Sequence, residues 1–473
     1  MQEILIGSAL NPVYTLIPCP VFSQVLCSRG KPQEVVEENQ NDEKEGLDQR
    51  GSIVSRHVVI IGAGVVGAIS AIEALRAGLR VTLVEPGSPG DRQASSYGNA
   101  GWLSSHSVIP PALPGVWKSV PRFIMDPLGP LAIRWRYLPS SAPWLIRYLA
   151  SGWTPERVET CAHALRTLLA GAVDLHRSLA REAGVPELVE HRGLLHPYLS
   201  REGFKADRFG WDLRRKTGIE WQELEGEAMR ELEPNLSPRY QFGVLVDEAG
   251  HCRDPGRYVS ALVDHAVALG AELVAGSATG FRIEGDRLKA VQTGTSEIPC
   301  HAAVIAAGAH SKDLATAAGD RVPLETERGY HVLLDDPEVE PRFPVMVSDC
   351  KAVVTRMEKG LRIAGQVEIG GLEAAPDWRR ADILRDHLVT VYPGLPRTLP
   401  SQRLHYWLGH RPSMPDGRPC IGQARRSPDI IHAFGHGHVG LVGSARTGRI
   451  VAQLLAGQTP DIPLEPFDPR RFS

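Results

Sequence analysis

Three glycines and one glutamate form the clearest chemical pattern in the sequence. The segment GAGVVG at residues 62–67 follows a short apolar run, and Glu85 ends a second one. Glycines at this spacing allow a tight turn, a close approach of backbone amides to a pyrophosphate, and close packing of a helix on a strand. A carboxylate after the next strand can accept hydrogen bonds from ribose hydroxyls. The pattern predicts a dinucleotide site whose contacts are Gly62, Ala63, Gly64, Val65, Val66, Gly67 and Glu85.

The flanking residues predict the elements that would position this site. Residues 58–61 are apolar without alternation, as in a central parallel strand that is covered on both faces. Apolar residues then recur at helical spacing from residue 65 to 77, and Gly78 ends the helix before a second strand at residues 80–84. The helix N-terminus would face the phosphates. Because the negative Glu85 would repel a 2′-phosphate, FAD or NAD is expected rather than NADP.

A second glycine-rich turn lies near the end of the chain. Residues 430–434 read as a strand, GHGHVG follows at residues 435–440, and apolar residues at helical spacing run from Leu441 to Leu455. NAD sites rarely require such a second turn. A flavin does, because a helix N-terminus directed at its pyrimidine edge stabilises the negative charge that appears on reduction. The two turns together favour FAD.

Composition and charge favour an ordinary globular protein with a small-molecule ligand. The 473 residues are 42% hydrophobic and 23% charged, with a formal net charge of −3, which gives no electrostatic support for a nucleic-acid partner. Seven scattered cysteines without CxxC spacing predict a reducing compartment. Because no His, Cys, Asp or Glu residues cluster at the spacing of metal ligands, no metal site is expected. No apolar run reaches the roughly 18 residues of a transmembrane helix, so none is expected.

Hydrophobic periodicity predicts several further elements. A long helix is expected over residues 155–183, a strand over 191–199 and another over 240–246. Asp254 and Pro255 predict the start of a helix that runs to about residue 269. Residues 272–274 and the two strands around Glu284-Gly285-Asp286 resemble a β-meander. Residues 303–306 resemble a buried strand, which ends in the small residues Ala307 and Gly308, where a backbone must pass close to a cofactor.

The predicted fold class is α/β, or α+β overall, with a Rossmann-type FAD-binding domain and an interleaved antiparallel-sheet substrate domain. Residues 31–50 are polar, acidic and free of aromatic side chains, which predicts a disordered N-terminal extension. The expected boundaries are 1–56 for this extension; 57–190, 252–322 and 412–460 for a discontinuous FAD-binding domain; 191–251 and 323–411 for the substrate domain; and 461–473 for a C-terminal tail.

A proline-rich segment at residues 111–153 mixes tryptophan with arginine. A basic aromatic surface of this kind suits the interface of a membrane, although packing against the neighbouring domain would explain it equally. We therefore expect a cytoplasmic protein. Peripheral contact with the inner face of the membrane is an open alternative. The residues concerned are Trp117, Trp135, Trp144 and Trp153, with Arg122, Arg134, Arg136 and Arg147.

Taken together, these motifs resemble the FAD-dependent D-amino-acid oxidase-like superfamily, most closely the bacterial D-amino-acid dehydrogenases, including D-hydroxyproline dehydrogenase-type members. The resemblance rests on GAGVVG at 62–67, SSYGNAG at 95–101, AAGA at 306–309, RGYH at 328–331, WLGHRPSMPDGRPCIG at 407–422 and GHGHVG at 435–440. It implies further FAD contacts at Ser96, Asn99, Gly101, Ala278, Ala307, Gly308, Gly435, His436, Gly437, His438 and Gly440.

The resemblance also implies three residues around the substrate. Arg411 follows Gly409-His410, in the Gly-x-Arg-Pro setting where relatives bind the substrate carboxylate, and a guanidinium offers two parallel donors to the two oxygens. The competing interpretation is a salt bridge between domains. Tyr330 and His331 would complete the pocket by hydrogen bonding or by excluding water, or would be packed sheet residues.

The implied reaction is hydride transfer from the α-carbon of a D-amino or cyclic D-imino acid to flavin N5. Such a reaction depends mainly on orientation and desolvation, and the resemblance favours a quinone or another carrier over oxygen as the electron acceptor. Two alternatives remain open at this point. One is a glycine or sarcosine oxidase-like amine oxidase that uses oxygen, and the other is a non-catalytic flavoprotein.

Overall fold

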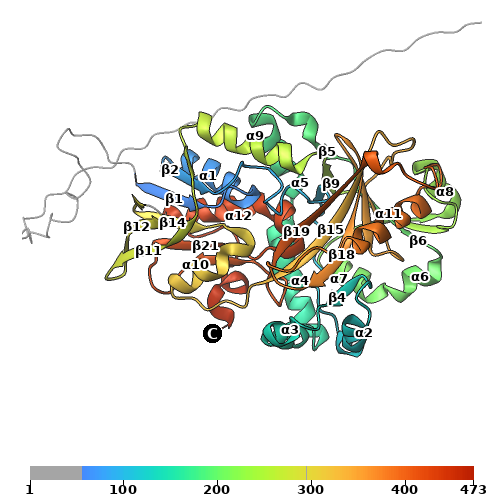
Figure 1. The fold of residues 1–473 in the computed structure, drawn as a ribbon, viewed down its shortest axis with the longest axis horizontal. Coiled ribbons are helices and arrows are strands. Elements are labelled where there is room, and N and C mark those ends of the chain that lie inside the picture. The colour runs from blue at the N-terminus through green and yellow to red at the C-terminus, as the bar shows by residue number, and fades with distance from the viewer. Residues whose placement is uncertain (1–55, 295, 473) are drawn as a thin grey trace, which may run out of the picture. The chain divides into compact units, whose positions relative to one another are not determined.

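A mainly parallel sheet forms the core of one of the two halves of the fold (Figure 1). The computed structural model describes residues 56–294 and 296–472. Five parallel strands and one antiparallel edge strand pair in the order β10-β2-β1-β14-β21-β20. The predicted strands β1, β2 and β21 are confirmed. The strands are β1 His57–Ile61, β2 Arg80–Glu85, β10 Glu272–Ala275, β14 Ala302–Ile305, β20 Cys420–Gln423 and β21 Ile430–Phe434.

Helices cover one face of this sheet and a small meander covers the other. Val58 and Ile60 share a core with the helices, whereas Val59 and Ile61 share one with the meander and α10, so alternate residues of β1 face opposite layers. The helices are α1 Val65–Arg76, α4 Pro155–Leu169, α5 Ala172–Glu182, α9 Pro255–Ala268 and α12 Gly440–Leu455; the meander is β11 Ala278–Glu284, β12 Arg287–Thr293 and β13 Glu297–Pro299, beside α10 Ser311–Ala317.

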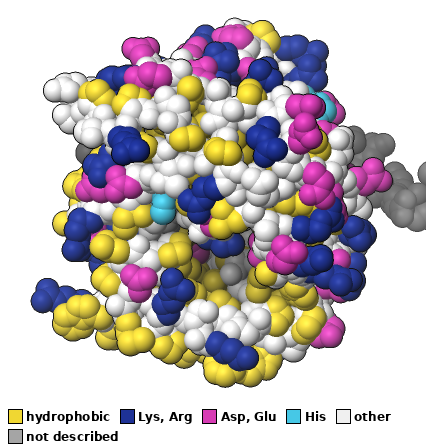
Figure 2. Space-filling model, turned by 90° about the vertical axis from the view of Figure 1, so that its right-hand side faces the viewer, with side chains coloured by type: hydrophobic (Ala, Val, Ile, Leu, Met, Phe, Trp, Pro, Cys, Tyr) yellow, Lys and Arg dark blue, Asp and Glu magenta, His cyan; other side chains and the backbone are white. Residues whose placement is uncertain are grey.

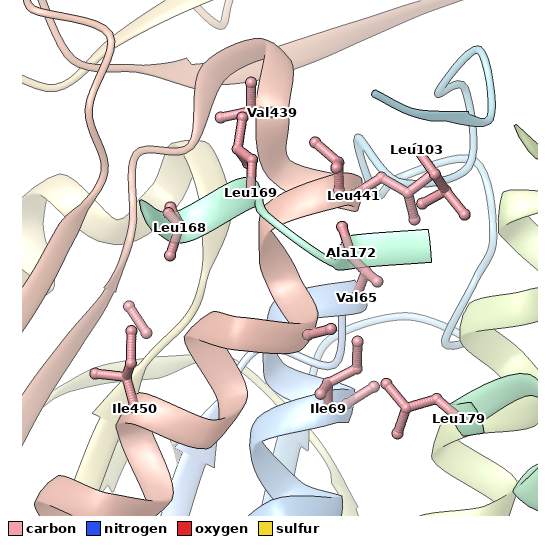
Figure 3. Packing of buried hydrophobic residues seen from close by; sticks show 14 of the residues in the cluster. Val65, Ile69, Leu103, Leu168, Leu169, Ala172, Leu179, Val439, Leu441 and Ile450 are labelled. Atoms are coloured by element: carbon pink, nitrogen blue, oxygen red, sulfur yellow. The ribbon is translucent and has the colours of Figure 1, made fainter. Parts of the chain in front are cut away.

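Helices α1 and α12 pack closely together below the two glycine-rich turns. Figure 3 shows Val65 and Ile69 of α1 directed toward the same apolar cluster as Leu441 of α12. A Cβ at Gly448 would lie 2.7 Å from Ile69 Cγ2, so the glycine allows the two helices to approach. This packing fixes the N-termini of both helices with respect to each other, and both N-termini meet the cavity described below.

A larger mixed sheet forms the second half of the fold. Its strands pair in the order β19-β15-β18-β17-β16-β6-β8-β7, with β4 added beside β18. The predicted antiparallel pairing holds except for the pairs β16–β6 and β4–β18, which are parallel. Helix α11, Arg379–Val391, shares a core with this sheet. The strands are β4 Leu131–Ile133, β6 Leu194–Tyr198, β7 Gln222–Glu225, β8 Phe242–Val246, β15 Glu325–Asp335, β16 Val345–Val347, β17 Ala352–Met357, β18 Gly360–Ile369 and β19 Leu404–Ser413.

Shorter elements complete the described chain. A three-stranded sheet consists of β3 Trp102–Leu103, β5 Val189–His191 and β9 Gly250–Cys252. The remaining α-helices are α2 Val120–Met125, α3 Leu138–Ser151, α6 Arg201–Ala206, α7 Arg208–Lys216 and α8 Gly226–Leu232. The 3₁₀ turns are η1 Val116–Ser119, η2 Pro186–Leu188, η3 Gly308–His310, η4 Ser401–Arg403, η5 Gly437–Val439, η6 Glu465–Phe467 and η7 Pro469–Phe472.

Three predicted elements differ from the structure. The expected helix over 155–183 is two helices, because Gly171 adopts a left-handed φ of 69° between α4 and α5. The expected strand over 191–199 is divided between β5 and β6, which belong to different sheets, with Gly193 at a φ of 76° between them. Residues 272–274 lie in β10 and extend the parallel sheet beside β2 instead of joining the meander.

Within the described ranges, no helix combines the length and the apolar character that crossing a membrane requires. The predicted disordered extension at residues 1–56 lies, except for Arg56, outside the described residues.

Candidate active site

A single large cavity connects the glycine-rich turns to the mixed sheet. Its volume is about 1880 Å³, which exceeds the roughly 300–1,000 Å³ of a typical small-ligand pocket. Its lining includes the β1–α1 turn at one end and residues of β15, β18 and β19 at the other. The cavity therefore has room for a dinucleotide and a second molecule together.

The β1–α1 turn has the geometry that the glycine pattern predicts. Gly62 has a φ of 100°, and a Cβ at this residue would lie 2.6 Å from the carbonyl oxygen of Ala306. A Cβ at Gly67 would lie 1.8 Å from the carbonyl oxygen of Gly62. Neither position can carry a side chain, so both glycines are needed for the turn itself.

The N-terminus of α1 is open toward the cavity. Gly64 is its N-cap, no side chain caps it in that role, and its first turn contains no acidic residue. The Ser96 hydroxyl accepts a hydrogen bond from Val65 N at 3.3 Å. Helix N-termini attract anions through unpaired N–H groups and the helix dipole. The turn thus fits a pyrophosphate.

Glu85 lies at the far end of β2 and lines the same cavity. Its Oε2 accepts a hydrogen bond from Ala63 N at 2.8 Å, which fixes the carboxylate beside the turn. Ala278, at the start of β11, also lines the cavity. Both residues therefore line the cavity, and their contacts with a ribose and an adenine stay predictions.

The second glycine-rich turn meets the cavity from the other side. Gly435 and Gly437 have φ values of 83° and 53°, and no side chain caps the following helix α12. The His436 imidazole is buried and hydrogen bonds to Thr447 Oγ1 at 3.0 Å, and burial lowers its pKa to about 4. His436 is therefore a neutral structural side chain, and the backbone of the turn faces the cavity.

Most predicted cofactor residues line the cavity. Three do not: Ala63 bonds to Glu85, Gly67 packs under the turn, and Gly101 allows its strand to approach the carbonyl oxygen of Cys252. The predicted residues in the lining are Gly62, Gly64, Val65, Val66, Glu85, Ser96, Asn99, Ala278, Ala307, Gly308, Gly435, His436, Gly437, His438 and Gly440.

Arg411 projects into the cavity from β19. Its Nη1 donates to the carbonyl oxygen of Gln366 at 3.2 Å, and within the described ranges no carboxylate lies within 4.0 Å of its guanidinium. The guanidinium lies over Gly329, where a Cβ would be 2.3 Å from Arg411 Cζ. Burial lowers the pKa of Arg411, whereas Glu327 raises it, and the group remains a cation at neutral pH. Arg411 thus offers charged donors to a ligand.

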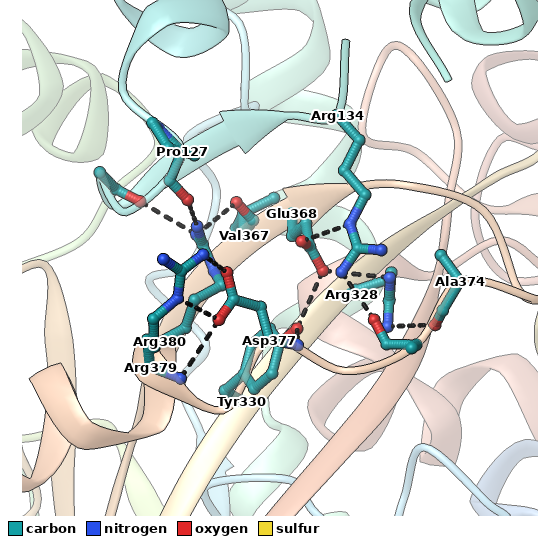
Figure 4. Close-up of polar contacts among 12 residues, drawn as sticks. Pro127, Arg134, Arg328, Tyr330, Val367, Glu368, Ala374, Asp377, Arg379 and Arg380 are labelled. Carbon is teal, nitrogen blue, oxygen red and sulfur yellow. Dashed lines mark hydrogen bonds and ion pairs between the residues drawn. The ribbon is translucent and has the colours of Figure 1, made fainter. Parts of the chain in front are cut away.

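Tyr330 contributes to the lining of the cavity, but its side chain is buried and its hydroxyl belongs to a polar network behind the wall (Figure 4). The hydroxyl donates to Glu368 Oε2 at 2.9 Å and accepts from Asp377 N at 3.1 Å. Arg134 Nε lies 2.7 Å from Glu368 Oε1, and Arg328 Nη1 lies 3.2 Å from Oε2. The network ties β4, β15, β18 and the start of α11 together and leaves the tyrosine hydroxyl engaged.

His331 does not line the cavity. Its ring stacks on Trp407 with centroids 5.1 Å apart, and its Nδ1 lies 3.2 Å from the carbonyl oxygen of Gly98. Burial, followed by the positive charge of Arg362, lowers its pKa well below the ordinary value. The imidazole is neutral and supports the wall from behind.

Several lining residues escaped the sequence analysis. Glu325, Glu327 and Gly329 alternate along β15 and line the cavity together. Period-two alternation in the segment ETERGYH would have placed them on one face. The nearby Gln366 offered no comparable signal, because its contact with Arg411 depends on the fold.

Comparison with known proteins identifies the family. Residues 57–454 match the family described as FAD dependent oxidoreductase. The chain belongs to this family. It is 65% identical over 417 residues, 88% of this chain and 99% of the relative, to a D-amino-acid oxidase of Bradyrhizobium diazoefficiens. It is 29% identical over 427 residues, with 88% and 99% coverage, to a D-amino acid dehydrogenase of the same organism.

Solved structures confirm the fold class. Glycine oxidase from Geobacillus kaustophilus matches with a TM-score of 0.66 at 20% identity, over 88% of this chain and 98% of the other. L-proline dehydrogenase from P. horikoshii matches with a TM-score of 0.64 at 21% identity, over 88% and 98%. The cofactor of this family member is FAD, and the uncapped N-termini of α1 and α12 and the carboxylate of Glu85 fit it.

Proposed function

We propose that the protein oxidises D-amino acids, or cyclic D-imino acids, at FAD. FAD, when bound, supplies the acceptor for a hydride from the substrate α-carbon at its N5 atom. The observation that carries the proposal is the cavity-facing guanidinium of Arg411, which has no carboxylate partner within the described part of the chain. The names of the relatives, D-amino-acid oxidase and D-amino acid dehydrogenase, support this substrate class.

The role proposed for Arg411 follows from its geometry. A guanidinium binds a carboxylate through two parallel hydrogen bonds, which fixes the orientation of the bound molecule. Gly329 provides the space in which the guanidinium lies, and the carbonyl oxygen of Gln366 holds one of its nitrogens. A substrate held in this way presents its α-carbon in one defined position, and correct orientation is a large part of catalysis.

The test is anaerobic bleaching of the flavin absorbance by D-amino acids, D-proline, hydroxy-D-proline, their L-enantiomers, glycine and sarcosine. Bleaching by D-amino or D-imino acids, but not by the L-enantiomers, supports the proposal. Bleaching by glycine or sarcosine alone would replace it with the amine oxidase alternative. A flavin that stays oxidised with every amine would contradict it.

We propose a quinone or another carrier as the electron acceptor. The relatives named dehydrogenases support this, whereas the name of the 65% identical relative favours oxygen. After anaerobic bleaching, the colour should return faster with a soluble quinone than with air-saturated buffer. Rapid recovery in air with stoichiometric hydrogen peroxide would contradict a carrier and support an oxidase.

We propose further that the segment from η1 to Trp153, which lies just after α3, contacts an anionic membrane surface. Large apolar side chains on this segment are exposed, and basic side chains lie among them. Figure 2 shows hydrophobic and basic side chains along the lower edge of the molecule, where α2 and α3 lie in Figure 1. Exposed aromatic and basic side chains together suit a lipid interface. The exposed fractions are 52% for Trp117, 75% for Met125, 69% for Trp135, 67% for Ile146 and 63% for Trp153.

Co-sedimentation with phosphatidylglycerol vesicles tests this contact. The double variant Trp135→Ser, Trp153→Ser should bind the vesicles at least tenfold more weakly than the unmodified protein. Phe209→Ser, which changes an aromatic residue on α7 that is 42% exposed, is the control and should bind normally. Equal binding of both variants would contradict the membrane proposal.

A further inference from the structure

Glu327 is a buried carboxylate next to Arg411 for which the proposed function provides no role. The two residues are directly opposite each other in the register of β15 and β19, so their side chains leave the same face of the sheet. Glu327 is 3% exposed and lines the cavity. A negative and a positive group therefore lie side by side in the wall, without forming an ion pair within 4.0 Å.

The neighbours of Glu327 keep it ionised. Burial alone would raise the pKa of its carboxyl, but His438, Arg411 and Ser413 outweigh burial and hold the pKa below the usual value. Tyr148 of α3 also faces the carboxylate, and burial and Glu327 both raise the pKa of this phenol, so it stays neutral. Glu327 is therefore an anion wherever the enzyme operates near neutral pH.

His438 connects this buried anion to the open cavity. Its Nε2 lies 2.7 Å from Glu327 Oε2, and its side chain is 50% exposed. It belongs to the glycine-rich turn at η5, which lines the cavity. An imidazole in this place can accept a proton inside the cavity and release it to solvent.

An α-amino acid carries its carboxylate and its amino group on the same carbon atom, and the paired charges of Arg411 and Glu327 are complementary to both. On the basis of the proposed function, we propose that Glu327 and His438 form the part of the site that deprotonates and binds the amino group of the substrate. His438 accepts the proton that the substrate ammonium must lose, and Glu327 hydrogen bonds to the resulting amine and stabilises the positive charge that forms on its nitrogen during oxidation.

The reaction balances in two steps. First, the ammonium transfers one proton to the His438 imidazole, which passes it to solvent, and a neutral amine remains. Second, the bond between the α-carbon and its hydrogen breaks, the electron pair leaves with the hydrogen as hydride to the oxidised flavin, and the nitrogen lone pair forms the C=N bond of an iminium cation. The cation appears beside Glu327, and a fixed opposite charge at such a position stabilises a transition state.

The test uses the FAD-loaded enzyme and two readouts. One is the anaerobic rate of flavin reduction by D-alanine between about pH 6 and pH 10, and the other is the Kd of propanoate, which is D-alanine without its amino group. Glu327→Gln should lower the limiting reduction rate about 100-fold and leave the propanoate Kd within about threefold, because Arg411 still binds the carboxylate. If the role of Glu327 were purely structural, the variant would show both slower flavin reduction and weaker binding of propanoate.

Glu233→Gln is the matched control. Glu233, which follows α8, is also a buried carboxylate, but it accepts hydrogen bonds from Arg342 N and Phe343 N and does not line the cavity. The flavin of this variant should be reduced at a rate close to that of the unmodified enzyme. His438→Gln should shift the rise of the reduction rate by about one pH unit or more toward alkaline pH, because the substrate must then lose its proton to solvent.

Three results would overturn the inference. They are a reduction rate of Glu327→Gln within threefold of the unmodified enzyme, a parallel loss of propanoate binding in a variant that retains FAD, and an unchanged pH profile for His438→Gln. If Glu327→Gln does not retain FAD, the His438→Gln profile decides alone. An unmodified enzyme that no D-amino acid reduces would instead refute the proposed function.

Discussion

Arg328 and Arg411 lie on neighbouring strands of the mixed sheet and serve opposite purposes. Arg411 shares a face with Glu327 and opens into the cavity, where its guanidinium donates a hydrogen bond to the backbone oxygen of Gln366. Arg328, which follows Glu327 in β15, is fully buried. It contacts Glu368 at 3.2 Å and donates to the carbonyl oxygen of Ala374 at 2.7 Å. Strand alternation separates the two arginines.

The difference shows that a charge identifies a ligand site only when its partners within the protein are incomplete. On the cavity face, one arginine lies beside one carboxylate, and neither satisfies the other. On the opposite face, Arg134 and Arg328 bind Glu368, and Arg380 donates to backbone oxygens of Pro127, Gly129 and Val367 (Figure 4). The first arrangement is available to a substrate, whereas the second supports the wall.

The largest effect is expected from breaking the buried network. Glu368→Gln removes the carboxylate that Arg134 and Arg328 share, and uncompensated buried charges cost about 3–5 kcal/mol. The free energy of unfolding, measured by urea denaturation, should fall by this amount. Arg379→Gln is the control, because its ion pair with Asp377 is largely exposed on the arginine side, where solvent screening leaves it little effect on stability. Equal losses in both variants would show that the network has no special role.

A smaller effect should follow from Gly329→Ala on the cavity face. The new Cβ would lie 2.3 Å from Arg411 Cζ, so the flexible guanidinium must move. Misplacement by about 1 Å can cost about 100-fold in rate, and we expect a 10- to 100-fold loss in flavin reduction by D-alanine. The unfolding midpoint should change little. A large loss of stability with normal activity would contradict this account of Gly329.

The smallest effect concerns pH. Burial, followed by the charges of Arg328 and His310, lowers the pKa of His410 to about 4. The unfolded chain binds this proton at about pH 6.5, so the stabilising contribution is complete above pH 6.5 and is lost as the pH falls from 6.5 toward 4. His410→Gln should reduce the stability difference between pH 7 and 5.5 by about 1 kcal/mol. An unchanged difference would show that folding does not lower the pKa of His410.

The sequence predicted the parts of the fold that local rules determine. The β1–α1–β2 unit and the second glycine-rich turn were predicted because glycine requirements and apolar periodicity are local properties of the chain. Helix α9 was predicted from Asp254, whose side chain accepts a hydrogen bond from Arg257 N as an N-cap should. The break between α4 and α5 was missed, since a single glycine in an otherwise helical pattern does not reveal its φ.

The candidate site was predicted less completely, for a physical reason. Arg411 could be named from its short motif, but whether a side chain is free or engaged depends on strands distant in sequence. Tyr330 and His331 illustrate this, because Glu368 holds the hydroxyl of the first and Trp407 covers the second. Glu327 was overlooked although its strand alternates regularly, because its significance depends on the register that pairs it with Arg411.

The central claim is that Arg411 recognises the carboxylate of the substrate. The most direct test compares anaerobic flavin reduction by D-alanine and by D-alaninamide, which lacks the carboxylate, in the unmodified enzyme and in Arg411→Leu. We predict that the unmodified enzyme prefers D-alanine by about 100-fold or more, equivalent to about 2.7 kcal/mol, and that Arg411→Leu reduces this preference to within about threefold while it retains FAD. An undiminished preference in Arg411→Leu, or no preference in the unmodified enzyme, would contradict the account.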